Sequence, residues 1–199
     1  MRTDRMKEYE RGQDHEIYEA VMMRREAGHL KRWHQMPING EDTVATHCWN
    51  ATSMLLQFKP NASRELIIYM LEHDISERWI GDITAPAKSM FPELAKAVKI
   101  AEAILSDEMN LNNAAGLDPT DRCWAKAMDA LDAWLFCQDQ VNMGNRNASL
   151  PLGELGKWLK ENKSVPPVVA GFVNGFRWQR YPDYLWEGER YGRDNAENV

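Results

Sequence analysis

The sequence predicts an all-α fold of about seven helices in a single domain. Apolar residues recur at spacings of three and four through most of the 199 residues, and this spacing places them on one face of a helix. Alternating apolar and polar runs, which indicate half-buried strands, are nearly absent. Hydrophobic residues make up 44% of the chain, which can supply one core for a domain of this length. We therefore expect one domain over residues 1–199.

Helix boundaries follow from residues that start or stop helices. Gly28 follows the first expected helix, and Pro60 lies just beyond the second, as helix-terminating residues do. The stretch "DPT" at 118–120 predicts a turn and the start of another helix. The expected helices cover residues 12–27, 43–58, 63–73, 91–109, 120–143, 150–162 and 166–178.

Two connections between these helices contain proline and glycine, and we expect them to be irregular. They are "RWHQMPINGED" at 32–42 and "GDITAPAKSMFP" at 81–92. Loops of this kind can present backbone and side chains to a ligand.

The composition excludes several classes of partner. Lys plus Arg total 24 against 30 for Asp plus Glu, and the net charge of −6 comes without a basic block, so no nucleic-acid polymer is expected as a partner. No apolar run approaches the roughly 18 residues that span a membrane, and the N-terminus has no apolar core of the signal-peptide type. The three cysteines have no CxxC spacing, which argues against a disulfide framework and favours a reducing cytoplasm.

The C-terminal stretch "FVNGFRWQRYPDYLWEGERYGRDNAENV" is rich in aromatic residues. Aromatic side chains are costly to leave in water, so we expect this stretch to pack on the helical body or on a second subunit. A homo-oligomer, either a dimer or a larger assembly, is therefore expected.

His47 is the first candidate for chemistry. It shares the three-four spacing of an apolar stripe that includes Val44, Ala51 and Leu55, so its imidazole should point inward. The common alternative is a core histidine bonded to a backbone carbonyl.

The adjacent His73 and Asp74 end the apolar run of the next helix. Neighbouring residues lie about 100° apart around a helix, so this pair can converge on one ion only from a helix end beside a cavity. Glu77, one turn beyond His73, should face the same space. The alternative is that Asp74 and Glu77 are solvated charges, and for Glu72 we expect that simpler state.

Asp129 and Asp132 lie in an otherwise apolar helix, where a carboxylate is costly unless it is paired or bound to metal. At least one should be a ligand, and the spacing alone does not choose between them. With the two histidines and Asp74, it would complete a mixed nitrogen and oxygen set that suits Mn, Fe, Co, Ni or Mg better than a thiolate zinc site does. Such an ion would lower the pKa of a water molecule enough to supply a nucleophile.

The order "H … HD … D" on successive helices resembles the HD-domain metal-dependent phosphohydrolases. Four blocks are similar to those of the small bacterial 5′-deoxynucleotidases and cover about residues 30–145: "RW" at 32–33, "VATH" ending at His47, "HDISERWIGDITAPAK" at 73–88 and "AMDALDAWLFCQDQVNMGN" at 127–145. The resemblance implies an HD-type helical bundle and a divalent metal, either one of the ions above or Zn. It also implies a deoxynucleotide substrate.

The resemblance also assigns roles to residues. It implies metal ligands at His47, His73, Asp74 and Asp129. The "DAL" match selects Asp129 over Asp132. Glu77 takes the place of the acidic residue that handles protons, a role that suits a carboxylate general acid or base.

The remaining assignments concern the substrate. Arg32 matches the phosphate-binding arginine, whose guanidinium can hold a phosphate through two parallel bonds. Trp33 matches a residue near the sugar, where its ring can crowd a ribose 2′-hydroxyl. Asp82 matches an acid at the substrate, and Lys88 is a candidate second cation. His34, where proline or another uncharged residue is expected, is a phosphate donor, a base contact or a plain loop side chain.

One departure concerns the residue before His47. Thr46 stands where the nucleotidases usually carry an acidic residue, so the orientation of His47 should rely on a different group.

The leading functional hypothesis is a metal-dependent phosphohydrolase of deoxynucleoside 5′-monophosphates. The first alternative is a deoxynucleoside triphosphate triphosphohydrolase that releases tripolyphosphate, as similar phage-type enzymes do; the cations Arg24, Arg25 and Lys31 keep it open. The second is a nucleotide-binding module without turnover. The third is a structural polar network without metal, which must satisfy several buried charges and is therefore costly.

Overall fold

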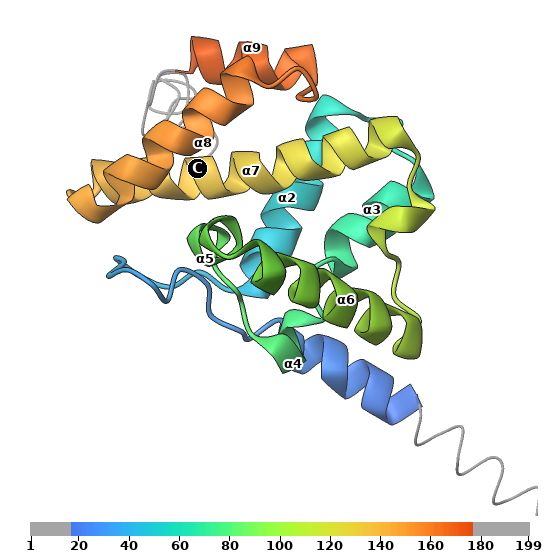
Figure 1. Cartoon of the computed structure of the whole chain (residues 1–199). Helices are drawn as coiled ribbons and strands as arrows, with labels where there is room; N and C mark the ends of the chain where they lie inside the picture. The colour runs from blue at the N-terminus through green and yellow to red at the C-terminus, as the bar shows by residue number, and fades with distance from the viewer. Residues whose placement is uncertain (1–16, 177–199) are drawn as a thin grey trace, which may run out of the picture.

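The computed structural model describes residues 17–176 and confirms the all-α fold (Figure 1). Within this range no strand forms, and one isolated antiparallel bridge pairs Lys31 with Thr43. An N-terminal helix is described over 17–27. The helices that follow are α2 (Val44–Phe58), α3 (Arg64–Glu72), α4 (Glu77–Ile80), α5 (Ala85–Met90), α6 (Pro92–Glu108), α7 (Pro119–Asn142), α8 (Ser149–Glu161) and α9 (Pro167–Gly175), with 3-10 turns η1 (Ala114–Gly116) and η2 (Arg146–Ala148).

The expected helices within this range agree with the structure to within a few residues, because local capping sets their ends. Thr43, Ser63 and Asp118 each accept a hydrogen bond from the backbone N–H three residues later and so begin α2, α3 and α7. The expectations for residues 12–16 and for the aromatic stretch beyond residue 176 lie outside the described residues.

The segment 81–92, expected to be an irregular loop, is in part helical. Thr84 caps α5 by accepting from the N–H of Ala87, and Pro86 sits in the first turn, where a proline costs a helix little. Gly81 ends the short helix α4 in a left-handed conformation with φ of 75°, which glycine adopts without strain. The proline and glycine that suggested a loop are therefore helix boundaries.

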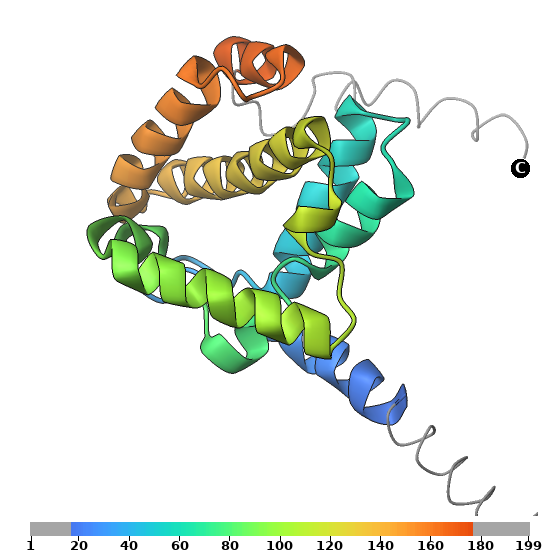
Figure 2. The same ribbon diagram turned by 45° about the vertical axis from the view of Figure 1, so that its right-hand side comes forward.

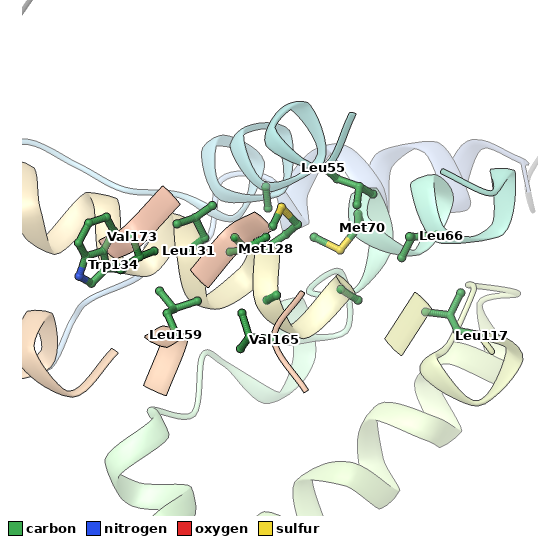
Figure 3. Packing of buried hydrophobic residues seen from close by; sticks show 14 residues of the cluster. Leu55, Leu66, Met70, Leu117, Met128, Leu131, Trp134, Leu159, Val165 and Val173 are labelled. Atoms are coloured by element: carbon green, nitrogen blue, oxygen red, sulfur yellow. The ribbon is translucent and has the colours of Figure 1, made fainter. Parts of the chain in front are cut away.

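Helix α7 is the centre of the fold. It packs against α2 on one side and α8 on the other (Figures 1 and 2). The core lies between these helices and includes Leu55, Met128, Leu131 and Leu159, all with no exposed surface (Figure 3). Burying side chains of this size is the main source of stability in a helical bundle.

Helix α8 approaches α7 closely at Gly156. A Cβ placed there would lie 2.9 Å from Nε1 of Trp134, so any larger residue would require the indole or the helix to shift. Among the described residues, no helix is long and apolar enough to cross a membrane.

Glu72 is not the solvated charge that was expected. Its carboxylate accepts from Nη2 of Arg24 at 3.1 Å and from the backbone and side-chain N–H groups of Asn112, both at 3.1 Å. These contacts tie the N-terminal helix and the connection before α7 to the end of α3, directly beside His73.

Candidate metal centre and substrate site

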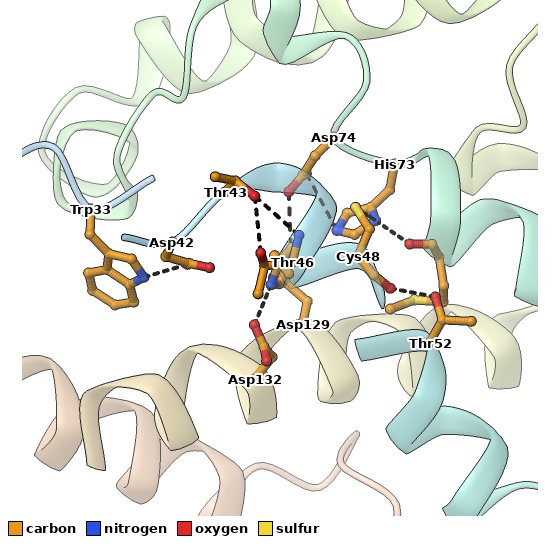
Figure 4. Close-up of polar contacts among 12 residues, drawn as sticks. Trp33, Asp42, Thr43, Thr46, Cys48, Thr52, His73, Asp74, Asp129 and Asp132 are labelled. Atoms are coloured by element: carbon orange, nitrogen blue, oxygen red, sulfur yellow. Dashed lines mark hydrogen bonds and ion pairs between the residues drawn. The ribbon is translucent and has the colours of Figure 1, made fainter. Parts of the chain in front are cut away.

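The four expected metal ligands come together from three parts of the chain, and His73, Asp74 and Asp129 are labelled in Figure 4. His47 lies on α2, His73 caps the end of α3 with Asp74 after it, and Asp129 lies on α7. Nε2 of His47 is 3.1 Å from Oδ1 of Asp129 and 3.7 Å from Oδ2 of Asp74. Nε2 of His73 is 3.4 Å from Oδ1 of Asp74.

Each of the two imidazoles is oriented by a hydrogen-bond acceptor at its Nδ1 atom. Nδ1 of His47 lies 2.7 Å from Oδ2 of Asp132, and Nδ1 of His73 lies 3.0 Å from the backbone carbonyl oxygen of Met70. A carboxylate and a carbonyl only accept, so both Nδ1 atoms donate. Each Nε2 atom therefore faces the cluster as the position for a second proton or a metal ion.

The spacing of His47, His73 and Asp129 fits one divalent ion, and Asp74 lies at ligand distance from each histidine through a different carboxylate oxygen. Ligand atoms about 2.1 Å from a common ion lie about 3.0 Å apart at a right angle and about 4.2 Å apart when opposite, and the three distances above fall in this range. One ligand atom each from His47, His73 and Asp129 lies within 4.8 Å of the others.

A second possible group was not expected from the sequence. It consists of Cys48, His73 and Asp74, again with one atom each within 4.8 Å. The Cys48 sulfur, however, approaches Nδ1 of His73 at 3.9 Å, on the nitrogen that already bonds Met70. Cys48 therefore lies behind the ring rather than on the side of Asp129.

Arg32 and Glu77 are ionisable residues buried beside the cluster. Burial lowers the pKa of Arg32, but Asp74, Asp129 and other carboxylates more than offset this and raise it overall. Burial, with Asp74 and Asp82 nearby, raises the pKa of Glu77 to about 9, against the opposing effects of Arg32 and Lys88. The Glu77 carboxyl therefore keeps its proton at neutral pH.

His73 is also strongly perturbed. Burial lowers its pKa, but Asp74 and Cys48 favour the charged imidazolium and raise the pKa to about 10. Since Nδ1–H bonds to Met70, the proton that titrates is the one on Nε2, which a metal ion would replace.

Four buried polar side-chain atoms have no hydrogen-bond partner within residues 17–176, and all four belong to this site. They are Nη1 of Arg32, Nε2 of His47, Nε2 of His73 and Oε2 of Glu77. The two Nε2 atoms face carboxylate oxygens at 3.1 Å and 3.4 Å but form no hydrogen bond to them. Buried polar groups almost always have hydrogen-bond partners, so this concentration of atoms without one is typical of a place where a ligand binds.

Trp33 has a strained backbone beside Arg32. Its φ of 59° is rare for a bulky residue. The ring stacks on Phe136 with centroids 5.0 Å apart, and its Nε1–H donates to Oδ2 of Asp42 at 3.1 Å. These contacts, with the backbone hydrogen bond from Arg32 to Asp42, fix the loop next to the cluster.

The other expected substrate residues lie on the two connections that were singled out from the sequence. Nδ1 of His34 is 3.7 Å from Oδ2 of Asp82, so the two connections meet there. Nζ of Lys88, on α5, lies 3.9 Å from Oε1 of Glu102, and the positive charge of Lys88 acts to lower the pKa of Glu77.

Asp132 was set aside in favour of Asp129, and the sequence did not indicate its contact with His47. Its carboxylate contacts Nδ1 of His47, while Thr46 is exposed and bonds to Thr43 instead. The available indication was a second carboxylate on the apolar face of α7. The alternative for His47, a core histidine bonded to a backbone carbonyl, does not match this contact, because Nδ1 of His47 faces the Asp132 carboxylate.

A cleft of about 260 Å³ adjoins the cluster on the side of His73. Its lining includes Asp129 and His73 of the cluster together with Tyr69, Arg122 and Lys126. Two cations thus stand beyond the cluster, on the same face of α7 as Asp129.

Comparison with known proteins identifies the family. A sequence model of the YfbR-like 5′-deoxynucleotidases matches residues 20–177. The chain belongs to the YfbR-like 5′-deoxynucleotidase family. This match extends the resemblance beyond 30–145 at both ends, so the N-terminal helix, α8 and α9 are part of the family's architecture.

Curated relatives of this YfbR-like protein carry the same family name. A 5′-deoxynucleotidase of Vibrio cholerae is 29% identical over 126 residues, 56% of this chain and 63% of the relative. One from Photobacterium profundum is 26% identical over 169 residues, 74% of this chain and 86% of the relative. The chain therefore spans about 63% of the length of the first of these relatives.

A solved structure supports the fold of this YfbR-like chain. The HD phosphohydrolase DatZ of cyanophage S-2L, bound to dA and one catalytic Zn²⁺ ion, superimposes with a TM-score of 0.58 at 20% identity. The superposition covers 77% of this chain and 91% of DatZ. At this identity the likeness concerns the helical architecture.

Proposed function

We propose that this protein is a divalent-metal-dependent phosphohydrolase that releases phosphate from deoxynucleoside 5′-monophosphates. The observation that carries the proposal is the set of four unpaired buried atoms, which belong to Arg32, two histidines and Glu77. A phosphate monoester and a metal ion together offer partners to all of them. Membership of the 5′-deoxynucleotidase family supports the substrate class.

The residues present fit a divalent ion. Under the proposal His47, His73, Asp74 and Asp129 hold it, since their Nε2 and carboxylate atoms lie at ligand spacing. Once bound, a divalent ion supplies Lewis-acid polarisation of a phosphoryl oxygen and makes water a stronger nucleophile at neutral pH. Two imidazoles with two carboxylates suit Mn, Co, Fe, Ni, Zn or Mg.

Arg32 binds the phosphate in this proposal. Its guanidinium is buried among carboxylates that hold it charged, and Nη1 is available for a phosphate oxygen. A guanidinium can form two parallel bonds to phosphate. Lys88 adds a second positive charge near the same carboxylates.

Glu77 moves the proton. Because its raised pKa keeps the carboxyl protonated, it can donate to the 5′-oxygen as the bond between phosphorus and that oxygen breaks. The oxygen of the attacking water joins phosphorus, and one of its protons returns to Glu77. The products are a deoxynucleoside and inorganic phosphate, and the residue is restored.

The sugar lies next to Trp33 under this proposal. The stack with Phe136 and the bond to Asp42 hold the indole still, so a bulky ring can exclude a 2′-hydroxyl. His34 and Asp82 meet at the junction of the two connections and are proposed to contact the nucleoside there.

A second candidate substrate, a deoxynucleoside triphosphate, is favoured by the cleft beyond His73. If the sugar is at Trp33 and the first phosphate is at the cluster, further phosphates extend along α7 toward Lys126 and Arg122. Arg122 already donates to two backbone carbonyl oxygens, and Lys126 lies over the ring of Trp158. Both cations are thus partly engaged, so we place the monophosphate first.

The test is product analysis by liquid chromatography. The protein is incubated with Mn²⁺, Co²⁺ or Mg²⁺ and with ribo- and deoxynucleoside mono-, di- and triphosphates. We expect inorganic phosphate and nucleoside from deoxynucleoside monophosphates. Tripolyphosphate and nucleoside would support the second candidate, and binding without any product would leave a nucleotide-binding module.

We further propose that the chain forms one domain and acts in the cytoplasm as a homo-oligomer. The described surface exposes large apolar side chains such as Trp49 and Ile104, which an interface would cover. Light scattering of the purified full chain tests the assembly, and a monomer at micromolar concentration would contradict it.

A further inference from the structure

We propose that Asp132 is a positioning residue that sets the metal affinity of this chain by holding His47. The inference deepens the proposed function and rests on it, because it assigns a partner to one of the proposed metal ligands.

The contact is short and enclosed. Nδ1 of His47 and Oδ2 of Asp132 are 2.7 Å apart, and the two side chains are 0% and 8% exposed. Hydrogen bonds to an ionised acceptor are shorter and stronger than neutral ones, and water does not compete at this depth. The carboxylate therefore fixes both the rotation of the ring and the nitrogen that carries the hydrogen.

Helix α7 holds the ring of His47 from both sides. Asp129 faces Nε2 at 3.1 Å and Asp132 faces Nδ1 at 2.7 Å. Residues three apart in a helix lie on the same face, so one face of α7 supplies both a proposed ligand and the group that orients another. A rotation of the imidazole would break the contact with Asp132 and turn Nε2 away from Asp74 and Asp129.

Asp132 is itself held in place. Burial raises the pKa of Asp132 to about 6, while the positive charge of Arg32 and the Asn50 side chain oppose this and favour the ionised carboxylate at neutral pH. Asn50 lies on α2, three residues after His47, so two positions of the same helix act on Asp132. The carboxylate therefore joins α2 to α7 at the point where each contributes a proposed ligand.

Nothing nearby duplicates this contact among the described residues. Thr46, the sequence neighbour of His47, is exposed and its hydroxyl lies 3.1 Å from that of Thr43. His73 is oriented instead by the backbone carbonyl of Met70, which no side-chain substitution removes. Loss of Asp132 should therefore release one of the two histidines and leave the other in place.

The experiment is a metal titration of the full-length protein and three variants. Binding of Mn²⁺ is measured by calorimetry, and binding of Co²⁺ by its visible absorption. We expect Asp132→Ala to weaken binding by about 10- to 100-fold, the range found when a histidine ligand loses its partner. Asp132→Asn should lose less, because its amide oxygen still accepts from Nδ1–H. The matched control is Asp121→Asn, a buried carboxylate of the same helix whose partners are Ser63 and Lys59, and it should bind as the wild type does.

Nitrogen-15 shifts of the His47 ring give a readout that a purely structural role would not move. The wild type should carry the hydrogen on Nδ1, and Asp132→Ala should lose that preference. Unchanged affinity in Asp132→Ala, an equal loss in Asp121→Asn, or no metal binding by the wild type would each overturn the proposal. If the metal response is as expected but no nucleotide is hydrolysed, the proposed activity fails and the role of Asp132 stands.

Discussion

Two buried polar clusters lie along α7, and they differ in whether their atoms have partners. At the start of the helix, Asp121 accepts from Oγ of Ser63 at 2.5 Å and lies 3.5 Å from Nζ of Lys59. About two turns later, Asp129 and Asp132 flank His47, and this second cluster contains the unpaired buried atoms.

The difference separates a structural cluster from a functional one. Burying a polar group without a partner costs free energy, so a protein keeps such groups where a ligand supplies the missing contact. The first cluster is complete in itself and needs nothing from solution. The second is completed by a metal ion and a phosphate under our proposal.

The largest effect that tests this contrast is expected from Asp74→Ala. Asp74 lies within 3.7 Å of Nε2 of His47 and within 3.4 Å of Nε2 of His73, so its removal takes away the carboxylate between both rings. We expect metal binding and turnover to be lost together. Calorimetric titration with Mn²⁺ and phosphate release measure the two, and retained activity would contradict the assignment of Asp74 as a ligand.

A smaller effect on binding but a large one on rate is expected from Glu77→Gln. The substitution keeps the size of the side chain and removes the proton that Glu77 is proposed to donate, so kcat should fall about 10²- to 10⁴-fold. Metal affinity should stay near the wild-type value. If affinity falls as far as kcat does, Glu77 is a ligand rather than a proton carrier.

A graded effect is expected from pH. His73, with its pKa raised to about 10, holds a proton on Nε2 at neutral pH, and a metal ion must displace it. Metal affinity should therefore rise as pH increases toward 10, by up to about tenfold per unit for this one proton, and should fall as pH decreases. Calorimetry in buffers of different ionisation enthalpy counts the released protons, and a count of zero at pH 7 would contradict the raised pKa.

The sequence predicted part of the second cluster and made no prediction about the first. The helical spacing placed His47 inward and marked Asp129 and Asp132 as costly in an apolar helix, and the family resemblance chose Asp129. The sequence could not show that Asp132 contacts Nδ1 of His47, because that contact depends on the packing of α2 on α7. The pairing of Asp121 with Ser63 across 58 residues is equally a product of packing.

The fold shows the same division between local and distant determinants. Long helices were predictable because each carries many turns of apolar spacing and its own cap. Helix α5 was not, because six residues with a proline give too short a pattern, and the cap at Thr84 stabilises it. The cleft beside His73 could not be predicted from the sequence, because Tyr69 and Lys126 come together there only after α3 packs on α7.

The smallest effect on the metal site is expected from Asp121→Ala, which removes the first cluster's carboxylate. Ser63 and Lys59 lose their partner, so the free energy of unfolding should fall by about 1–3 kcal/mol, measured by urea denaturation with a chelator present. Residues 121 and 129 are about 12 Å apart along the helix, and sites at such a distance usually contribute independently. Metal affinity should therefore stay within about twofold of the wild type, and Asp121→Ala combined with Asp132→Ala should show additive losses of stability. A loss of metal affinity in Asp121→Ala alone would mean that the two clusters act as one unit, and that the unpaired atoms do not by themselves mark the limits of the site.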